Sequence, residues 1–288
     1  MLQKRLVTIQ DISCIGKCSL TAAIPIISAF GIEAVPLPTA ILSTHTGANF
    51  AGYTFRDLTD DMEGIAAHWQ SFGASFDAIY TGYLGSIHQL DIVERFICNF
   101  RTKDNLVFVD PVMGDEGKLY AGFDMDFAKK MHELCSHADI ICPNVTEEAY
   151  LTGTPYLQEH TKDYVSHLAH ALTETGAKTI IVTGLSDKDM VGSLCLDTKT
   201  GEEGIYMRKK IPGVYYGTGD IFASVLSSAL TREISLADSL NLATDFVCQS
   251  IASTQNELGK YDYGVKFEEN LYMITDFVKQ ISIFTHKN

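Results

Sequence analysis

The sequence predicts an α/β fold: a three-layer α/β/α sandwich in which helices flank a mostly parallel central sheet, with a small lid segment. Two observations predict it. Short, β-rich apolar runs alternate with segments of helical period through most of the 288-residue chain, and strand followed by helix, repeated, gives parallel strands joined by right-handed crossovers. Gly, Pro, Asp and Asn also gather directly after several of these runs, where ligands bind in such sheets.

Five runs are predicted as buried strands, because each is short and continuous and is bounded by Gly, Pro or Asp. They are RLVTIQ (5–10), DAIYTG (77–82), LVFVDP (106–111), ADIICP (138–143) and KTIIVTG (178–184). Apolar residues at helical spacing predict helices at about 57–72, 86–101, 124–136, 161–175, 218–231, 235–257 and 266–283.

Three other stretches complete the expected fold. Residues 33–47, EAVPLPTAILSTHTG, contain two prolines and end in polar residues, so they suit an edge or lid strand better than the sheet centre. A β-like run at 190–197 is followed by EGIYMRKKIPG at 203–213. No linker, repeat or change of composition divides the chain, so residues 1–288 are expected to form one domain.

The composition excludes several classes of partner. The net charge of −14 argues against a general nucleic-acid or anionic-membrane surface. No apolar run is long enough for a transmembrane helix, and the N-terminus reads as a strand rather than a signal peptide. The seven cysteines are scattered and odd in number, as expected of reduced thiols in a cytoplasmic protein.

The segment GTGD at 217–220 carries the strongest chemical signal. The apolar residues that follow it fit a buried helix face, so the glycines fall at a helix N-terminus. Free N–H groups and the helix dipole make such an end an anion site, and glycine lets a phosphate approach closely. The alternative is that Asp220 only complements the helix dipole.

A second group of polar residues follows two neighbouring strands. Asn144 and Glu147 stand three residues apart after the run at 138–143, and Asp110 ends the run at 106–111. Two carboxylates at one sheet end, near a phosphate site, suit a hydrated Mg²⁺ ion. Asn144 with Glu147 is equally typical of a capping box, which is a purely structural arrangement.

Two other motifs are excluded. DISCIGKC at 11–18 resembles a phosphate-binding P-loop, but that pattern needs Gly where Asp11 stands and Ser or Thr where Cys18 stands. A turn of small residues close to a ligand is expected there instead. The same loop lacks the G-x-G-x-x-G of nicotinamide-dependent oxidoreductases, which argues against that class.

Together, these segments resemble the pyridoxal kinase branch of the ribokinase-like small-molecule kinases. The resemblance rests on Gln10, on LSTHTG (42–47), TGYLGS (81–86), DPVMG (110–114) and PNVTE (143–147), and on GTGD (217–220). GTGD alone marks the wider superfamily, whereas the other segments point to the vitamin B6 branch. The segments span residues 10 to 220, which is most of the chain.

The resemblance implies that Asp220 is the general base for the substrate's hydroxymethyl group, with ATP as phosphoryl donor. The N–H groups of Gly217, Thr218 and Gly219 would cradle the transferring phosphoryl group. Asp110 and Glu147, the latter through water, would hold Mg²⁺. The expected nucleotide contacts are Asp110, Asn144, Thr183 and the basic run of Arg208, Lys209 and Lys210, for which a solvated basic turn is the alternative.

On the substrate side, Thr46 and Tyr83 match positions that line the pyridine pocket of relatives. Tyr83 offers a flat apolar face and a hydroxyl, although it could equally pack under a loop. Asp11 departs from the branch, which commonly has serine after Gln10. A carboxylate there could pair with a protonated ring nitrogen or an amine, so the hypothesis is a shift towards pyridoxamine over pyridoxal.

The resemblance also implies a homodimer whose small-molecule partners are a B6 vitamer and ATP. Three questions stay open at this point: the preferred vitamer, the oligomeric state, and a requirement for a monovalent cation such as K⁺. The alternatives are a hydroxymethylpyrimidine kinase, which shares the fold and GTGD, and a non-catalytic vitamer-binding protein, against which the presence of Asp220 argues.

Overall fold

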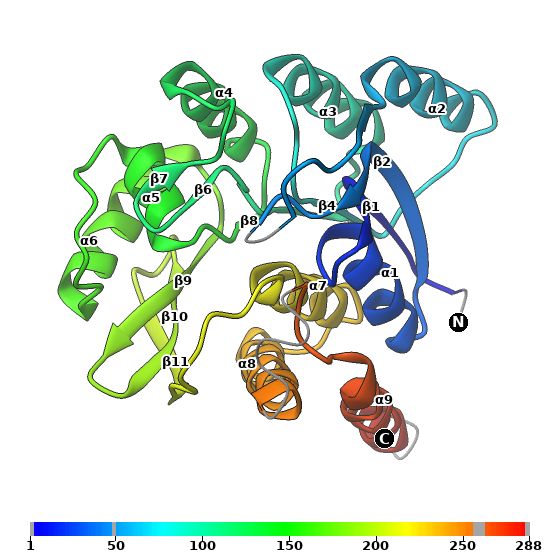
Figure 1. Ribbon diagram of the computed structural model, residues 1–288. Helices are drawn as coiled ribbons and strands as arrows, with labels where there is room; N and C mark the ends of the chain where they lie inside the picture. Colours follow the sequence, from blue (N-terminus) through cyan, green and yellow to red (C-terminus); the bar gives the residue numbers. More distant parts are fainter. Residues whose placement is uncertain (1–2, 48–49, 256–262, 286–288) are drawn as a thin grey trace.

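A nine-stranded sheet forms the centre of the computed structural model, which describes residues 3–47, 50–255 and 263–285 (Figure 1). Its strands are β1 (Arg5–Ile15), β2 (Glu33–Thr44), β3 (Phe55–Asp57), β4 (Ala78–Thr81), β5 (Leu106–Val109), β8 (Ile140–Ile141), β9 (Thr179–Asp187), β10 (Met190–Asp197) and β11 (Glu203–Lys209). Their order is β11-β10-β9-β8-β5-β4-β1-β2-β3. A separate two-stranded sheet pairs β6 (Gly114–Asp115) with β7 (Lys118–Leu119).

The middle of the main sheet is parallel, as predicted, and both of its ends are antiparallel. Strands β2, β1, β4, β5, β8 and β9 pair in parallel. At one end β9, β10 and β11 form antiparallel hairpins, and at the other the three-residue β3 pairs antiparallel with β2. The carboxyl ends of six strands therefore meet at one edge of the sheet.

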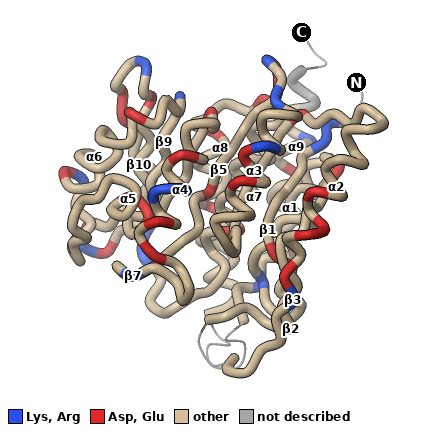
Figure 2. Tube along the Cα trace, turned by 90° about the horizontal axis from the view of Figure 1, so that it is seen from above, with Lys and Arg blue, Asp and Glu red and all other residues tan. Residues whose placement is uncertain are grey.

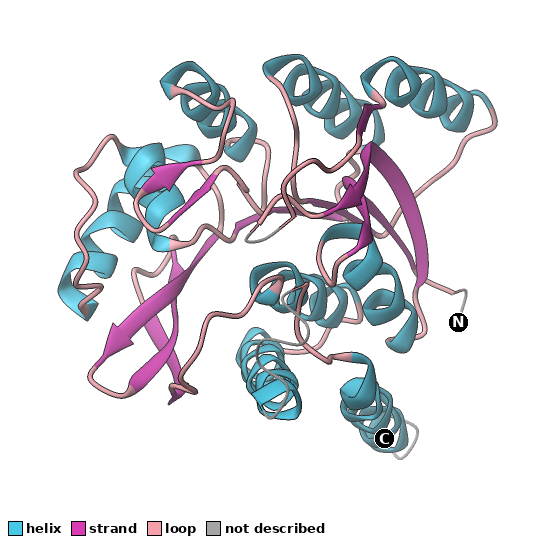
Figure 3. Cartoon of the chain, in the orientation of Figure 1, coloured by secondary structure: helices cyan, strands magenta, loops and turns pink. Residues whose placement is uncertain are grey.

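Helices cover both faces of the sheet (Figures 1 and 3). On one face lie α2 (Thr59–Ser71), α3 (Ile87–Phe100), α4 (Met125–Cys135), α5 (Val145–Thr152) and α6 (Lys162–Ala171), which continues into a 3₁₀ turn (Leu172–Thr175). On the other lie α1 (Ser19–Ala29), α7 (Thr218–Thr231), α8 (Leu236–Thr254) and α9 (Leu271–Thr285), which follows a 3₁₀ turn (Glu268–Asn270). The predicted three-layer sandwich is confirmed.

Alternate strand residues supply the two cores. In β4, Ile79 packs with the α2–α6 layer, whereas Ala78 and Tyr80 pack with the α1 and α7–α9 layer. In β5, Val107 and Phe108 divide in the same way. Successive residues that point to opposite faces, such as Val107 and Phe108, are both fully buried. These strands therefore appear as continuous apolar runs in the sequence.

Helix α1 is the main element that the sequence analysis did not predict. It contains Pro25, which has no N–H to donate and normally breaks a helix. The helix forms because one side of it is buried between β1 and α7: Ala22, Ala23, Ile26 and Ile27 have no exposed surface. Tertiary packing outweighs local propensity here.

Several predicted boundaries were wrong. Strand β1 continues past residue 10 to Ile15, so Asp11 lies in a strand rather than in the expected turn. Strand β9 continues to Asp187, and Arg208 and Lys209 belong to strand β11 rather than to a loop. The last helix begins with a 3₁₀ turn at Glu268 rather than at residue 266. Residues 256 and 257 of the predicted helix 235–257 lie outside the described residues.

Most of the stretch 33–47 forms strand β2, which lies next to the edge of the sheet rather than at its centre, close to the prediction. Strand β2 lies one place from the sheet edge and pairs with β1 over nearly its full length, whereas β3 covers only Ala40–Leu42. Pro36 and Pro38 precede that covered part, where β2 has no outer neighbour among the described strands. A residue without an N–H is tolerated at such an open edge.

Charge is dispersed over the surface. Figure 2 shows Lys and Arg segments interspersed with Asp and Glu on many elements rather than gathered on one face. The net charge of the whole chain is −14. No helix in the described part of the chain is long and apolar enough to cross a membrane.

Replacing Glu148 with methionine is expected to stabilise the protein by about 2 kcal/mol near pH 8. Glu148 of α5 has no exposed surface, and neither of its carboxylate oxygens has a hydrogen-bond partner among the described residues. Burial raises the pKa of Glu148 well above its ordinary value of 4.5. Between pH 4.5 and its raised pKa, Glu148 is protonated in the folded state and ionised in the unfolded chain. The free energy of unfolding therefore falls as the pH rises above 4.5.

Thermal melts of both proteins between pH 5 and 8 measure this effect. Glu148→Met should raise Tm by roughly 5 °C at the upper end and by less at pH 5. Glu133→Met, at an exposed position of α4, is the matched control and should change stability by under about 0.5 kcal/mol. A lower Tm for Glu148→Met at every pH would mean that the carboxyl group has a stabilising partner.

Candidate active site

The predicted site residues lie on or directly after neighbouring parallel strands of the sheet. Across the order β9, β8, β5, β4 and β1, these strands carry Thr183, the Asn144–Glu147 segment, Asp110, Tyr83 and Asp11. After β1 the chain forms β2 and β3 on one side of β1, and it then continues with β4 on the other side. The strand order therefore reverses at β1. Ligands of open α/β sheets bind at such a switch point.

The GTGD segment begins helix α7, as predicted. Gly217 is the N-cap residue, with a positive φ of 76°, and Thr218 is the first helical residue. A Cβ atom on Gly217 would stand 2.0 Å from the backbone oxygen of Lys17, so this position requires glycine. A Cβ on Gly219 would meet nothing within 4 Å, which leaves open space over the free N–H groups of the helix start.

The charge of Asp220 interacts with those of two other carboxyl groups, Asp11 and Asp110. It lies in the first turn of α7 and is partly buried. Burial raises the pKa of Asp220 to about 6; hydrogen bonding from the backbone N–H of Ser19 lowers it, and the charge of Asp11 raises it further. The charge of Asp220 in turn raises the pKa of Asp110. A carboxylate with this pKa is ionised at neutral pH and can still accept a proton, as a general base must.

Asn144 and Glu147 form the capping box that was the structural alternative. The Glu147 N–H donates to Asn144 Oδ1 at 2.9 Å, and the Asn144 N–H donates to Glu147 Oε2 at 2.8 Å. Glu147 Oε1 also accepts from the Met113 N–H at 3.0 Å, and Asn144 Nδ2 donates to the Gly114 carbonyl at 2.9 Å. The box thus joins α5 to the segment after β5 and fixes the Glu147 carboxylate beside Asp110.

Asp110 and Glu147 are two buried carboxyl groups, and the charge of Glu147 disfavours ionisation of Asp110. Both side chains are buried, and no Lys or Arg in the described part of the chain forms an ion pair with either of them. Burial and then the charge of Glu147 raise the pKa of Asp110, and burial also raises the pKa of Glu147. Such a pair is unfavourable without a cation, so the residues present fit a divalent ion.

Among the described residues, no three His, Cys, Asp or Glu side chains form a cluster that could hold a metal ion by themselves. This does not conflict with Mg²⁺, because Mg²⁺ typically keeps several waters and takes only one or two carboxylates besides substrate phosphates. The two-carboxylate set of Asp110 and Glu147 is of that kind.

Asp11 and Tyr83 form the substrate side of the site. Asp11 is 5% exposed, and the Ser13 hydroxyl donates to its Oδ2 at 2.9 Å. Tyr83 is half-buried, and its ring lies 5.7 Å from that of Phe123. Burial, followed by the charge of Asp11, raises the pKa of Tyr83 to about 12.

An aromatic group borders the predicted Thr46 position. Thr46 itself is exposed. The neighbouring His45 ring lies 5.0 Å from Phe50 and 5.4 Å from Tyr216, which precedes GTGD. A Cβ on Gly47 would stand 3.1 Å from both His45 and Tyr216, so this loop packs closely against the segment before α7.

The sequence analysis missed Tyr120. This residue follows β7, and its N–H donates to the Met113 carbonyl at 2.9 Å. The Tyr120 side chain is 41% exposed; partial desolvation, then the charges of Glu147 and Asp115, raise the pKa of Tyr120, and Asp220 and Asp110 add to the effect. The hydroxyl therefore lies near the carboxylates of the site. Only the β6–β7 turn brings it there, and no spacing in the sequence indicates that turn.

Of the basic residues Arg208, Lys209 and Lys210, the first is already bound to other side chains. Arg208 Nε donates to Asp245 Oδ1 at 2.6 Å and Nη2 to Asn241 Oδ1 at 3.1 Å, both on α8. Its charge is thus already paired. Lys209 and Lys210 are exposed, and among the described residues neither forms an ion pair. Thr183 is half-buried inside β9, and its N–H donates to the Pro143 carbonyl at 2.9 Å.

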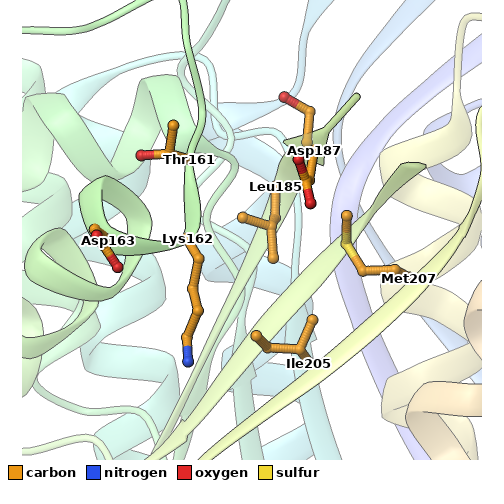
Figure 4. A pocket seen from close by; sticks show the side chains of 8 residues that line it. Thr161, Lys162, Asp163, Leu185, Asp187, Ile205 and Met207 are labelled. Carbon is orange, nitrogen blue, oxygen red and sulfur yellow. The ribbon is translucent and has the colours of Figure 1, made fainter. Parts of the chain in front are cut away.

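A surface pocket of about 370 Å³ lies elsewhere, between the start of α6 and strands β9 and β11 (Figure 4). Ile205 and Met207 line it from β11, whereas the intervening Tyr206 packs with the opposite layer. The pocket therefore lies on the α6 face of the sheet. None of the predicted site residues line it.

A ribokinase-like α/β sandwich with an aspartate at a glycine-lined helix start and carboxylates at the adjoining strand ends defines a small-molecule kinase. The chain belongs to the phosphomethylpyrimidine kinase family, because the sequence profile of that family matches residues 15–266. Its homologues and structural neighbours include pyridoxal kinases.

Three relatives illustrate this. A Bacteroides thetaiotaomicron protein, provisionally named a phosphomethylpyrimidine kinase and solved with pyridoxal, is 37% identical, with a TM-score of 0.89 over 94% of this chain and 96% of that one. Lactobacillus plantarum pyridoxal kinase is 32% identical, with a TM-score of 0.88 over 96% and 98%. Arabidopsis thaliana pyridoxal kinase is 28% identical over 233 residues, covering 77% of this chain and 72% of that protein.

Proposed function

We propose that this protein transfers the γ-phosphoryl group of ATP to the 5′-hydroxymethyl group of a vitamin B6 vitamer, as in B6 salvage. The observation that carries the proposal is the position of Asp220. It stands in the first turn of α7, next to Gly219 with its open space, and its charge interacts with those of Asp110 and Asp11. The relative solved with pyridoxal supports the choice of substrate.

The chain's own groups would divide the work as follows. Asp220 accepts the proton of the attacking hydroxyl group. The N–H groups of Gly217, Thr218 and Gly219 stabilise negative charge on the transferring phosphoryl group, and the Tyr120 hydroxyl lies on the same side of the site. Tyr83 and Thr46 border the ring of the substrate.

The nucleotide would lie along the β8 and β9 ends of the sheet. Asn144, Thr183 and Asp110 are the nearest predicted contacts, with Lys209 and Lys210 available from the edge of the sheet. Asp110, and Glu147 through water, would hold Mg²⁺, which neutralises phosphate charge when bound with ATP. Arg208 would contribute through its bonds to α8 rather than through direct contact.

The second candidate function is phosphorylation of hydroxymethylpyrimidine. The name of the matching family favours it, and its substrate is also a small aromatic alcohol. The two activities differ in the shape of the ring pocket rather than in the phosphoryl-transfer machinery.

These functions are separated by measuring the ATP- and Mg²⁺-dependent phosphorylation of four alcohols: pyridoxal, pyridoxamine, pyridoxine and hydroxymethylpyrimidine. Phosphorylation of a B6 vitamer with the highest kcat/KM supports the proposal. Turnover with the pyrimidine alone would assign the protein to thiamine metabolism and leave the roles of Asp220 and Mg²⁺ standing. Absence of turnover with all four, while ATP and a vitamer still bind, would favour a vitamer-binding protein.

Replacing Asp11 with serine is expected to lower the ratio of kcat/KM for pyridoxamine to that for pyridoxal about tenfold. Asp11 is a buried carboxylate on the substrate side, and no Lys or Arg in the described part of the chain forms an ion pair with it. The amine of pyridoxamine is a cation that could pair with it, and hydrogen bonds to charged groups contribute more than neutral ones.

The control is Asp61→Ser on the exposed first turn of α2, which removes an equal charge away from the pocket. Its kcat/KM ratio should stay at the wild-type value. An unchanged ratio in Asp11→Ser would show that Asp11 does not select the vitamer.

A further inference from the structure

The turn between β1 and α1 contains Gly16 and Lys17, the pair that gives this segment its partial likeness to a P-loop. In a P-loop the lysine reaches the phosphates of the nucleotide. Here the Lys17 ammonium group forms an ion pair with Glu268, at 2.7 Å between Nζ and Oε2. The Lys17 side chain is 19% exposed, and its Nζ lies 6.0 Å from the centre of the buried Phe267 ring. Lys17 therefore binds the part of the chain that precedes α9.

The backbone of Lys17 is held between two glycines from distant parts of the chain. On one side, the Lys17 N–H donates to the Tyr263 carbonyl at 2.8 Å, and a Cβ on Gly264 would stand 2.6 Å from the Lys17 Cβ. Gly264 has a φ of 138°, which residues with a side chain rarely adopt. On the other side, a Cβ on Gly217 would stand 2.0 Å from the Lys17 carbonyl oxygen. No side chain fits at either contact, so the three backbones pack directly against one another.

This packing connects residues 263–268 to the start of α7. Gly217 is the N-cap residue of that helix, and its carbonyl accepts a hydrogen bond from the Ile221 N–H at 3.1 Å. A displacement of the Lys17 turn towards Gly217 must move this helix start, because a close-packed interior transmits strain. A misplacement of about 1 Å in groups that position a reaction can lower its rate 100-fold.

From these contacts we propose that Lys17 is a positioning residue, which ties residues 263–268 to the glycine-lined start of α7. Its backbone transmits the position of Gly264 to Gly217, and its ion pair with Glu268 holds the turn in place. In this role Lys17 touches neither the nucleotide nor the alcohol. The proposal rests on the proposed function for the reaction that the α7 start assists, although not for the contacts themselves.

Substitutions that remove one charge separate this role from that of a phosphate-binding lysine. Lys17→Met and Glu268→Gln should each lower kcat about threefold and leave KM for ATP unchanged, and the double variant should lose no more than either alone. A lysine that binds phosphate would instead raise KM for ATP in Lys17→Met and leave Glu268→Gln at the wild-type values. The control is Lys129→Met, which removes the exposed Lys129–Asp126 ion pair of α4 and should change neither constant.

Gly264→Ala tests the backbone contact. The added Cβ meets the Lys17 Cβ, so kcat should fall by at least about tenfold while KM for each substrate stays within about threefold of wild type. In the Lys17→Gly background this clash is absent, and the further loss caused by Gly264→Ala should be under about threefold. Gly201→Ala is the matched control, because Gly201 also has a positive φ, of 74°, but a Cβ there would meet nothing within 4 Å. It should leave kcat unchanged.

Amide hydrogen exchange gives a readout that needs no substrate. The Ile221 N–H is bonded at the start of α7, and the Arg232 N–H is bonded to the Ser228 carbonyl at the end of the same helix, also at 3.1 Å. Gly264→Ala should speed exchange of the Ile221 N–H about tenfold relative to that of Arg232. This change is expected even if the protein phosphorylates none of the four alcohols, so failure of the proposed function and failure of this inference are separate results.

Three results would each overturn the inference. They are a rise in KM for ATP that is confined to Lys17→Met, equal losses of kcat on Gly264→Ala in the wild-type and Lys17→Gly backgrounds, and unchanged relative exchange of the Ile221 N–H in Gly264→Ala. If Gly264→Ala does not fold, the two ion-pair variants carry the test, because their expected loss of kcat at constant KM does not depend on the added Cβ.

Discussion

Replacing Asp220 with asparagine is expected to lower kcat/KM by about 10²–10⁴-fold. Asparagine keeps the size and hydrogen-bonding shape of the side chain but cannot accept the proton of the substrate hydroxyl. Binding of ATP and of the alcohol should persist, because the glycines of the α7 start and the Asp110–Glu147 pair are unchanged. Steady-state kinetics and calorimetric titration of each ligand measure the two effects separately.

The matched control is Asp238→Asn. Asp238 is the third residue of α8 as Asp220 is the third residue of α7, so both complement a helix dipole equally. If Asp220 were only a dipole-complementing residue, the two variants would behave alike. Equal and small losses in both would contradict the assignment of the base.

The pH profile of the wild type gives the same assignment another way. Because burial raises the pKa of Asp220 to about 6, the carboxylate is ionised above that pH and protonated below it. The base form is the active one, so log kcat/KM should fall with unit slope as the pH drops below about 6. This acid limb should be absent from the residual activity of Asp220→Asn.

Replacing Gly217 with alanine should damage both folding and activity. The added Cβ would stand 2.0 Å from the Lys17 backbone oxygen, and the φ of 76° disfavours any side chain. The conformational penalty alone is about 1–2 kcal/mol. Relief of the clash must move α7 away from the turn that contains Lys17 and Ser19, so we expect a Tm lower by several degrees and a loss of kcat/KM of roughly 100-fold.

Gly219→Ala separates the two effects. This position lies in a helix and has open space around its Cβ, so alanine should raise stability by about 1 kcal/mol. The new methyl group would occupy the space proposed for the phosphoryl group, and kcat/KM should fall although Tm rises. Unchanged turnover in Gly219→Ala would place the phosphoryl group elsewhere, and an unchanged Tm in Gly217→Ala would mean that the turn adapts.

The layered fold followed from the sequence because its signals are local and repeated. Five apolar runs predicted strands that the structure confirms, and helical spacing predicted all the larger helices except α1. Helix α1 was missed because Pro25 argues against a helix, and only burial between β1 and α7 outweighs it. The ends of β1 and β9 were placed too early for a related reason: polar residues continue each strand where neighbouring strands supply the pairing.

The chain by itself determined the chemical groups of the site and the strand or helix end on which most of them lie, because Gly, Asp and Asn after apolar runs mark the ends of elements. Only the tertiary structure decided how they are paired. It brought Asp220 close enough to Asp110 and Asp11 for their charges to interact, placed Tyr120 directly after the β6–β7 hairpin, and bound Arg208 to α8. Contacts of this kind join residues far apart in the chain, and they depend on strand order and helix packing, which no local spacing records.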